Sequence, residues 1–362
     1  QDLQAMANLL RRDSLEATSA AGSGHPSSCL SCAEIMSALF FSVIKEEDEF
    51  ILSKGHAAPM LWSVYAEAGI IPKAELKNLR KLESNLEGHP MPSMPLVKVA
   101  TGSLGQGLSA GLGMALAKKL KKEKGKVYVL LGDGECAEGS VWEAVNIASF
   151  YKANNLIALL DINSLGQSQH TMHDHQLKKY DKIFKAFGWE TLVIDGHNMN
   201  AILNVLKKAK ASSLPCAIIA KTKKGKGVSF LEGKEGWHGK ALKEEELQKA
   251  LKEIPEAKVK LPAHIKGKKF SPKIMLPEPI SYKKGDAIAT REAFGRALVN
   301  LGKKNPSIIA LDGDVKNSTM TEYFFTEFPE RSFQCYIAEQ NMVGMAIGFS
   351  GVGYVPFVAT FS

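Results

Sequence analysis

The sequence predicts an α/β protein with a doubly wound, mainly parallel sheet, followed by the start of a second, similar α/β domain. Two short apolar runs, at 127–132 and 156–162, are flanked by glycine or asparagine and are typical of buried parallel strands. A helical pattern at 138–155 separates them. Because strand, helix and strand follow in that order, this segment is predicted to be a parallel crossover unit.

The same reasoning extends in both directions along the chain. Helical spacing runs from 7 to 42, interrupted by a loop rich in glycine and serine, and two further strands are expected at 191–195 and 216–220 around a helix at 200–211. Lysine, glutamate and proline dominate 241–286. We therefore expect a first domain at 1–240, a linker at 241–286 and a second domain at 287–362.

The second domain is expected to be incomplete. After the linker we predict a helix at 290–304, a strand near 308, a strand and helix within 332–350, and a third strand near the end at Ser362. A sheet ending there would leave an unpaired edge and an uncovered apolar face.

Composition argues for a soluble cytoplasmic protein. Of 362 residues, 45% are hydrophobic and 23% charged, and no apolar run approaches the roughly 18 residues that span a membrane. Five cysteines are an odd set without metal-finger spacing, and the pair Cys29 and Cys32 lies in a helical pattern where small buried side chains are expected. These features favour a reduced compartment and no membrane association.

The net charge of +8 does not by itself indicate nucleic-acid binding. The basic segments at 118–126, 221–227 and 265–270 are interleaved with acidic residues and lack an aromatic ladder. Solvated surface lysines are the preferred interpretation, and attraction of a small phosphorylated substrate remains open.

Two polar residues directly follow the predicted strands at 127–132 and 156–162. Asp133 lies in GDGECAEGS and Asn163 in DINSLGQ, so both are expected at the carboxyl edge of the sheet, where open α/β folds bind ligands. Carboxylate, amide and loop carbonyl oxygens suit Mg²⁺ or Ca²⁺ carrying a diphosphate. The alternative for each residue alone is an ordinary Asx turn.

Three loops carry a histidine in a glycine-rich or proline-rich setting. They contain His25 in GSGHP, His56 in LSKGHAAP and His89 in EGHP. A lone loop histidine is more often a surface residue, but glycine and proline can fix a loop and direct an imidazole into a cleft. The bare segment 100–111 that follows is a weak signal for anion binding.

Taken together, the motifs resemble the transketolase family in order and spacing, nearest to its animal-type members. They are GSGHP, LSKGHAAP, GHP, ATGSLGQG, LLGDGE, DINSLGQS, IIAKTKKGKG, GWHGK, ATREAFG, ALDGDVKNST and CYIAEQNM. One departure is the short KEEDEF at 45–50, where the family has a longer loop.

The resemblance implies a transferase that uses thiamine diphosphate and Mg²⁺ or Ca²⁺ in the pentose phosphate pathway. It would move a two-carbon ketol unit from a ketose phosphate to an aldose phosphate, with the cofactor as electron sink for a carbanion. It also implies a diphosphate-binding first domain, a pyrimidine-binding second domain, and a homodimer with active sites at the interface. The metal ligands would be Asp133, Asn163 and the carbonyl oxygen of Leu165.

The resemblance carries further roles to individual positions. Catalysis is assigned to Glu339, which would hydrogen-bond a pyrimidine nitrogen of the cofactor, together with His25 and His238. Cofactor contacts fall on Ser28, His56, Gly102, Ser103, Leu104, Gly134, Asn163, Lys224 and His238. The sugar phosphate would contact His25, His89, His238, Arg291 and Ser318.

Other functions remain open at this stage. Dihydroxyacetone synthase is a related alternative, whereas the histidine motifs disfavour deoxyxylulose-phosphate synthase. A catalytically silent partner subunit is disfavoured because no motif residue is replaced. Beyond ATFS the family continues with residues that complete the pyrimidine and sugar sites, so we expect little ketol transfer from 1–362 alone unless a separate carboxyl-terminal half is supplied.

Overall fold

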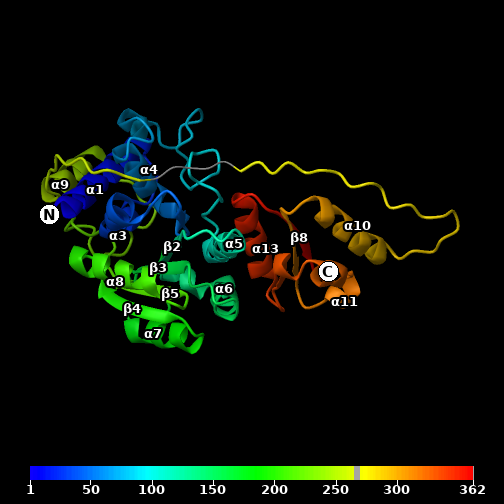
Figure 1. Ribbon diagram of the computed structural model, residues 1–362. Helices are drawn as coiled ribbons and strands as arrows, with labels where there is room; N and C mark the ends of the chain where they lie inside the picture. Colours follow the sequence, from blue (N-terminus) through cyan, green and yellow to red (C-terminus); the bar gives the residue numbers. More distant parts are fainter. Residues whose placement is uncertain (265–269, 362) are drawn as a thin grey trace.

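A computed structural model, which describes residues 1–264 and 270–361, contains two parallel sheets with helices packed against them (Figure 1). The first sheet has the strand order β1-β2-β3-β5-β4. Its strands are β1 Glu49–Leu52, β2 Val127–Gly132, β3 Leu156–Ile162, β4 Glu190–Asp195 and β5 Cys216–Lys221. The predicted strands are confirmed, and β1, which follows a short charged segment, was not predicted.

Helices cover both faces of this sheet, because alternate strand residues enter different cores. Tyr128 and Leu130 pack in the core that includes α1 Asp2–Ala21, α3 Ala33–Ala38, α4 Ala58–Glu67 and α8 Met199–Ala211. Val129 and Leu131 pack in the core that includes α5 Gly107–Leu120, α6 Gly139–Phe150 and α7 Leu177–Ala186. This is the doubly wound arrangement expected from the sequence.

Shorter elements complete this part of the chain. They are α2 Pro26–Ser31, the π-helical turn η1 Leu39–Val43, the 3₁₀ turns η2 Gly55–Ala57, η3 Lys73–Asn78 and η4 Gly134–Ala137, and helix α9 Glu244–Glu253. From residue 270 to the start of α10, an extended segment without helix or strand follows the outside of the molecule (Figure 1).

The second sheet has the parallel order β7-β6-β8. Its strands are β6 Ile308–Asp312, β7 Ser332–Gln334 and β8 Val355–Ala359. The associated helices are α10 Thr290–Lys304, α11 Lys316–Thr319, α12 Glu322–Glu327 and α13 Glu339–Gly351, with the turn η5 Pro329–Arg331. The elements predicted after the linker are confirmed.

Helices α5 and α13 join the two sheets by direct backbone contact (Figure 1). A Cβ atom on Gly348 would lie 1.9 Å from the carbonyl oxygen of Ala110, and one on Gly113 would lie 2.1 Å from that of Met345. Only glycine permits this approach. The Glu143 carboxylate of α6 also accepts a hydrogen bond from the Asn341 amide at 2.9 Å, so α13 is tied to two helices of the first core.

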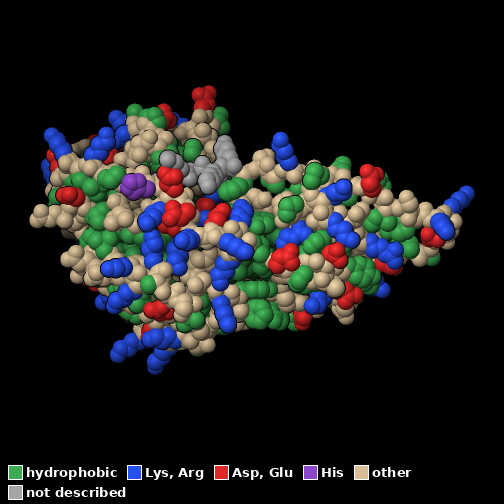
Figure 2. Space-filling model, viewed as in Figure 1, with side chains coloured by type: hydrophobic (Ala, Val, Ile, Leu, Met, Phe, Trp, Pro, Cys, Tyr) green, Lys and Arg blue, Asp and Glu red, His purple; other side chains and the backbone are tan. Residues whose placement is uncertain are grey.

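The surface agrees with the expectation of scattered charge. On the face shown in Figure 2, lysine and arginine side chains are interspersed with acidic and apolar ones and form no continuous basic track. Within residues 1–264 and 270–361, no helix is long and apolar enough to cross a membrane. All five cysteines are buried and free, as expected for packing residues.

Candidate active site

The carboxyl ends of the strands of the first sheet surround a cavity of about 400 Å³. Segments after β1, β2, β3 and β5 contribute to it, because parallel strands present their carboxyl ends at one edge. Most of the predicted site residues line this cavity: His25, Ser28, His56, His89, Gly102, Leu104, Asp133, Gly134, Asn163, Leu165, Lys224 and His238. The chain therefore brings together motifs separated by more than 200 residues.

Four imidazoles form a cluster in the cavity. The ring centroid of His25 lies 5.2 Å from that of His56, 6.4 Å from that of His89 and 4.9 Å from that of His238. Burial, with neighbouring positive groups, lowers the pKa of His25 to about 4 and that of His238 to about 4. The pKa values of His56 and His89 are lowered for the same reason. These rings are therefore neutral at pH 7 and can both donate and accept hydrogen bonds.

The predicted metal ligands lie at the ends of β2 and β3. Asp133 accepts hydrogen bonds from the Ser164 amide at 2.6 Å, the Thr171 hydroxyl at 3.0 Å and the Gly134 amide at 2.9 Å. Burial raises its pKa to about 6, although these hydrogen bonds act in the opposite direction. The Asn163 side-chain oxygen accepts from the Leu165 amide at 3.2 Å, so both side chains are already oriented.

Lys224 brings an ammonium group to the same place. Its Nζ donates to the carbonyl oxygens of Leu165 at 2.8 Å and Gly166 at 3.0 Å, and to Nδ1 of His238 at 2.8 Å. His238 consequently carries its proton on Nε2. Burial lowers the pKa of Lys224 to about 8, and the partners of its ammonium within the described residues are two carbonyl oxygens and an imidazole. A cation held only by neutral groups favours an anionic ligand.

A buried network centred on Asp161 was not anticipated from the sequence. Its carboxylate forms an ion pair with Lys54 and accepts hydrogen bonds from the hydroxyls of Ser31 and Thr222. Lys54 also donates to the Ser28 carbonyl at 3.1 Å. The pKa of Lys54 is raised because the charge of Asp161 outweighs burial, which alone would lower it. The available signals were a lysine beside His56 and an aspartate inside an apolar strand.

Glu135 is a second buried carboxylate that sequence reasoning missed. It accepts hydrogen bonds from the Ser53 hydroxyl, from the Gly105 amide at 2.9 Å and from the Gly132 amide at 3.0 Å. Burial raises the pKa of Glu135. The side chain therefore fixes the glycine-rich 100–111 loop against the loop that carries Asp133. The signal was its place in GDGE, directly after a strand.

The cavity fits a diphosphate and a divalent cation. The Ser28 hydroxyl is buried at the cavity and has no partner within the described residues, so a polar group is expected to meet it. Gly102 has φ 136° and a Cβ there would lie 2.7 Å from the His89 ring, which leaves bare backbone facing the cavity. Asp133, Asn163 and the Leu165 carbonyl offer oxygen donors only, as Mg²⁺ and Ca²⁺ require. The Leu165 oxygen has a second lone pair beside the one that Lys224 uses.

Within its described residues, the structure does not indicate a metal site built only from histidine, cysteine and carboxylate side chains. No group of three or more histidine, cysteine, aspartate or glutamate side chains suited to a metal occurs in the part of the chain that the structure describes. A cation at Asp133 would therefore depend on amide and carbonyl oxygens and on the ligand it carries.

Four predicted residues do not line the cavity. Ser103 is exposed on the 100–111 loop, Arg291 is exposed at the start of α10, and Ser318 is half-buried on α11. Glu339 begins α13 and is exposed. A single chain thus does not place Glu339, Arg291 or Ser318 beside Asp133.

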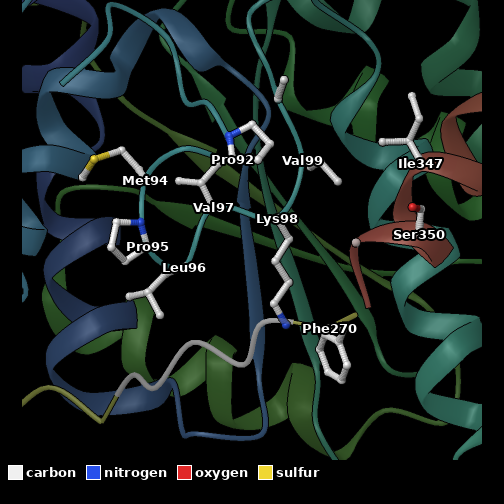
Figure 3. Close-up of a pocket in the computed structure, with 12 residues that line it drawn as sticks. Pro92, Met94, Pro95, Leu96, Val97, Lys98, Val99, Phe270, Ile347 and Ser350 are labelled. Carbon is white, nitrogen blue, oxygen red and sulfur yellow. The ribbon is translucent and has the colours of Figure 1, made fainter. Parts of the chain in front are cut away.

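A larger cavity of about 760 Å³ lies elsewhere, between the 92–100 loop, Phe270 and α13 (Figure 3). Its lining is mainly apolar, and Lys98 points toward the Phe270 ring, with Nζ 4.9 Å from the ring centroid. Lys98 is also paired with Glu49 at 2.5 Å. Without convergent polar groups, this cavity offers no chemistry comparable to that of the first.

Comparison with known proteins shows the family to which the chain belongs. Residues 3–271 match the family described as "Transketolase, thiamine diphosphate binding domain", and residues 286–362 match "Transketolase, pyrimidine binding domain". The chain is 49% identical to the transketolases of Mus musculus and Homo sapiens over its whole length. A crystal structure of transketolase from Campylobacter jejuni superimposes over 100% of the chain and 65% of that protein, with a TM-score of 0.89 and 31% identity.

The chain is shorter than these relatives. It spans 61% of the length of the mouse and human proteins. The similarity therefore covers all of this chain and about three fifths of the curated relatives it matches.

The lowered histidine pKa values predict a steep acid dependence of stability. The folded protein keeps His25 and His238 neutral down to about pH 4, whereas unfolded histidine binds a proton below about pH 6.5. Unfolding thus takes up protons in this window, and stability is lost as the pH falls through it. Between about pH 7 and about pH 5, the melting temperature of the wild type should fall more than that of a His25→Asn/His238→Asn variant. If the melting temperatures of the two proteins fall equally with pH, the lowered pKa values of His25 and His238 are contradicted.

Proposed function

Because the chain belongs to the transketolase family, we propose that it transfers a two-carbon ketol unit from a ketose phosphate to an aldose phosphate, using thiamine diphosphate and a divalent cation. The observation that carries the proposal is the cavity at the strand ends. There Lys224 and the oxygen donors Asp133, Asn163 and Leu165 face a group of neutral histidines. One side of the cavity suits a diphosphate and the other suits a sugar.

We assign the domains accordingly. Residues 1–240 would bind the diphosphate end of the cofactor, 241–286 would link the domains, and 287–362 would belong to a pyrimidine-binding domain. The two family matches, over 3–271 and 286–362, and the two separate sheets support two domains. Because the first match extends to residue 271 and α9 packs with Leu15 and Leu30, the first part of the 241–286 segment would lie against the first domain.

The diphosphate end would be held by charge and by bare backbone. Asp133, Asn163 and the Leu165 carbonyl would bind Mg²⁺ or Ca²⁺, Lys224 would neutralise phosphate charge, and Ser28 would donate its unpartnered hydroxyl. Gly102, Ser103, Leu104 and Gly134 would meet the cofactor through loop backbone, and His56 through its imidazole.

The histidines would act on the sugar. Neutral imidazoles can orient hydroxyl groups and pass protons between them at neutral pH, and His25 and His238 are the closest pair, 4.9 Å apart at their centroids. His89, at the edge of the cluster, would contact the remainder of the sugar. Thiamine diphosphate supplies the nucleophilic carbon and the electron sink.

The second set of site residues would come from a partner protomer. Glu339, Arg291 and Ser318 lie away from the cavity of their own chain, whereas the proposed reaction needs a carboxylate beside the pyrimidine and a phosphate clamp. Beside Glu339, the apolar side chains of Ile337, Val343 and Ile347 are 80%, 51% and 45% exposed. Such a surface is expected to be covered in an assembly, and a homodimer with shared sites meets both requirements.

A cytoplasmic location and a role in the pentose phosphate pathway complete the proposal. Five free, buried cysteines agree with a reducing compartment. Sugar phosphates are the substrates that the cationic, histidine-rich cavity suits best.

The reaction is tested by supplying xylulose 5-phosphate with ribose 5-phosphate or with formaldehyde as acceptor. Since the chain spans 61% of the length of the mouse and human transketolases, the carboxyl-terminal part of a full-length relative is added in trans. Product from ribose 5-phosphate supports transketolase activity. Preference for formaldehyde would indicate dihydroxyacetone synthase, and thiamine diphosphate binding without turnover of either acceptor would indicate a silent partner subunit.

Removing the Asp133 carboxylate should weaken cofactor binding. Calorimetry with Mg²⁺ present should show thiamine diphosphate affinity reduced by about tenfold or more in Asp133→Ala, since a direct ligand is lost. The matched control is Asp286→Ala, which removes an exposed carboxylate and should bind thiamine diphosphate as the wild type does. An unchanged affinity in a folded Asp133→Ala protein would remove the basis for the metal site.

Shared sites predict complementation between two defective variants. Asp133→Ala and Glu339→Ala should each bind thiamine diphosphate weakly, whereas a refolded mixture contains hybrid dimers with one site that has both intact residues. Calorimetry of the mixture should therefore reveal tight sites absent from either variant. If each variant behaves in the mixture as it does alone, Glu339 does not serve a partner's cofactor.

A further inference from the structure

His197 lies outside the cavity but contacts the segment that delivers Lys224 to it. The residue follows β4, at the carboxyl edge of the first sheet, and its side chain is 13% exposed. Its Nδ1 lies 3.0 Å from the Glu34 carboxylate of α3, and its Nε2 accepts a hydrogen bond from the Lys223 amide at 2.9 Å. None of the site motifs drew attention to this residue.

Glu34 decides which nitrogen of His197 carries the proton. The Glu34 carboxylate is 2% exposed, and its pKa is about 2, because hydrogen bonds from His197 and Arg11 with the charge of Arg11 outweigh the burial that would raise it. Arg11 donates to it at 2.6 Å. An ionised carboxylate only accepts, so Nδ1 of His197 must donate and Nε2 is left as an acceptor for the Lys223 amide.

The two residues before Lys224, Thr222 and Lys223, are held by different parts of the chain. The Thr222 hydroxyl donates to Asp161 of β3, and the Thr222 carbonyl lies 3.0 Å from Nε2 of His175. The Lys223 amide is held by His197, while the Lys223 ammonium lies 3.0 Å from Glu232, away from the cavity. The Lys224 ammonium alone enters the cavity.

Burying the Lys224 ammonium costs free energy, and the contacts of Thr222 and Lys223 keep it in the cavity despite that cost. The Lys224 side chain is 4% exposed, and burial together with the charge of Lys54 lowers its pKa to about 8. A lysine on a free loop would lower its energy by turning into water. Fixing the preceding backbone removes that freedom, because a rotation at Lys223 would break the bond to His197.

We propose that His197 is a positioning residue for the diphosphate site: its Nε2 holds the Lys223 amide, and this contact fixes the Lys224 ammonium where the phosphates of the cofactor bind. The ligand class is a diphosphate, so the inference rests on the proposed function. His197 itself does not touch the cofactor; it acts through the backbone of the adjacent residues.

Two conservative variants separate this role from a merely structural one. In His197→Gln the side-chain oxygen can reach the position of Nε2 and keep an acceptor for the Lys223 amide. In His197→Asn the shorter side chain can keep a donor to Glu34, near the position of Nδ1, but does not reach Lys223. If His197 acts by holding Lys223, the glutamine variant should keep more of the wild-type amide protection and cofactor affinity than the asparagine variant. If its role is limited to the hydrogen bond with Glu34, the asparagine variant should keep more of both.

The first measurement needs no cofactor. Hydrogen exchange of the unloaded protein should show the Lys223 amide protected in the wild type and His197→Gln, and exposed to exchange in His197→Asn. The melting temperature of each variant is recorded alongside, so that a general loss of structure is recognised. Equal protection of the Lys223 amide in the asparagine variant would overturn the proposal.

The second measurement is the affinity for thiamine diphosphate in the presence of Mg²⁺, by calorimetry. His197→Asn should bind on the order of tenfold more weakly, the size of effect known for outer partners of a ligand site, and His197→Gln should stay close to the wild type. Equal affinities of the asparagine variant and the wild type would also overturn the proposal. If the wild type itself does not bind the cofactor, the proposed function fails instead, and the exchange experiment still decides the role of His197.

Discussion

The buried ion pair between Lys54 and Asp161 is the interaction on which the candidate site depends. Asp161 lies near the end of the central strand β3, and its carboxylate contacts residues that follow β1, lie in α2 and follow β5. Both charges are fully buried, so removal of either partner would leave the other uncompensated, at a cost of about 3 to 5 kcal/mol. The pair is therefore weak evidence for stability but a strict constraint on how these segments meet.

The electrostatic character of the cavity follows from that constraint. Lys54 is neutralised by Asp161, while Lys224 has only carbonyl oxygens and an imidazole as partners. His25, His56 and His238 are held neutral by burial and by these nearby cations, and His89 by burial and the charge of Arg80. The cavity consequently has one unpaired positive charge beside Asp133, next to rings that can exchange protons. This is an arrangement that favours a phosphorylated ligand with a bound cation over a neutral or cationic one.

The contact between α5 and α13 places the second sheet beside the first without closing the cavity. Gly113 and Gly348 allow backbone atoms to touch, so the two helices have little freedom to slide. In this arrangement Glu339 begins α13 outside its own cavity and beside exposed apolar residues. The same packing that joins the sheets therefore keeps the proposed catalytic carboxylate away from the cavity of its own chain, which is the basis for proposing a shared site.

The sequence by itself determined the parallel strands β2 to β5, the helices α6 and α8, and the position of Asp133 and Asn163 at strand ends. These features depend on local apolar runs and on which residue follows a strand, and both can be read along the chain. Helix α7, between β3 and β4, was not predicted. The sequence also predicted the histidine motifs, though only the resemblance gave them roles. Tertiary structure alone decided that His25, His56, His89 and His238 form one cluster, that Lys54 pairs with Asp161 and that Glu135 ties two loops together. It also decided that His197 reaches Lys223. These contacts join residues far apart in the chain, and a buried charge reveals its partner only when the fold has brought the two together.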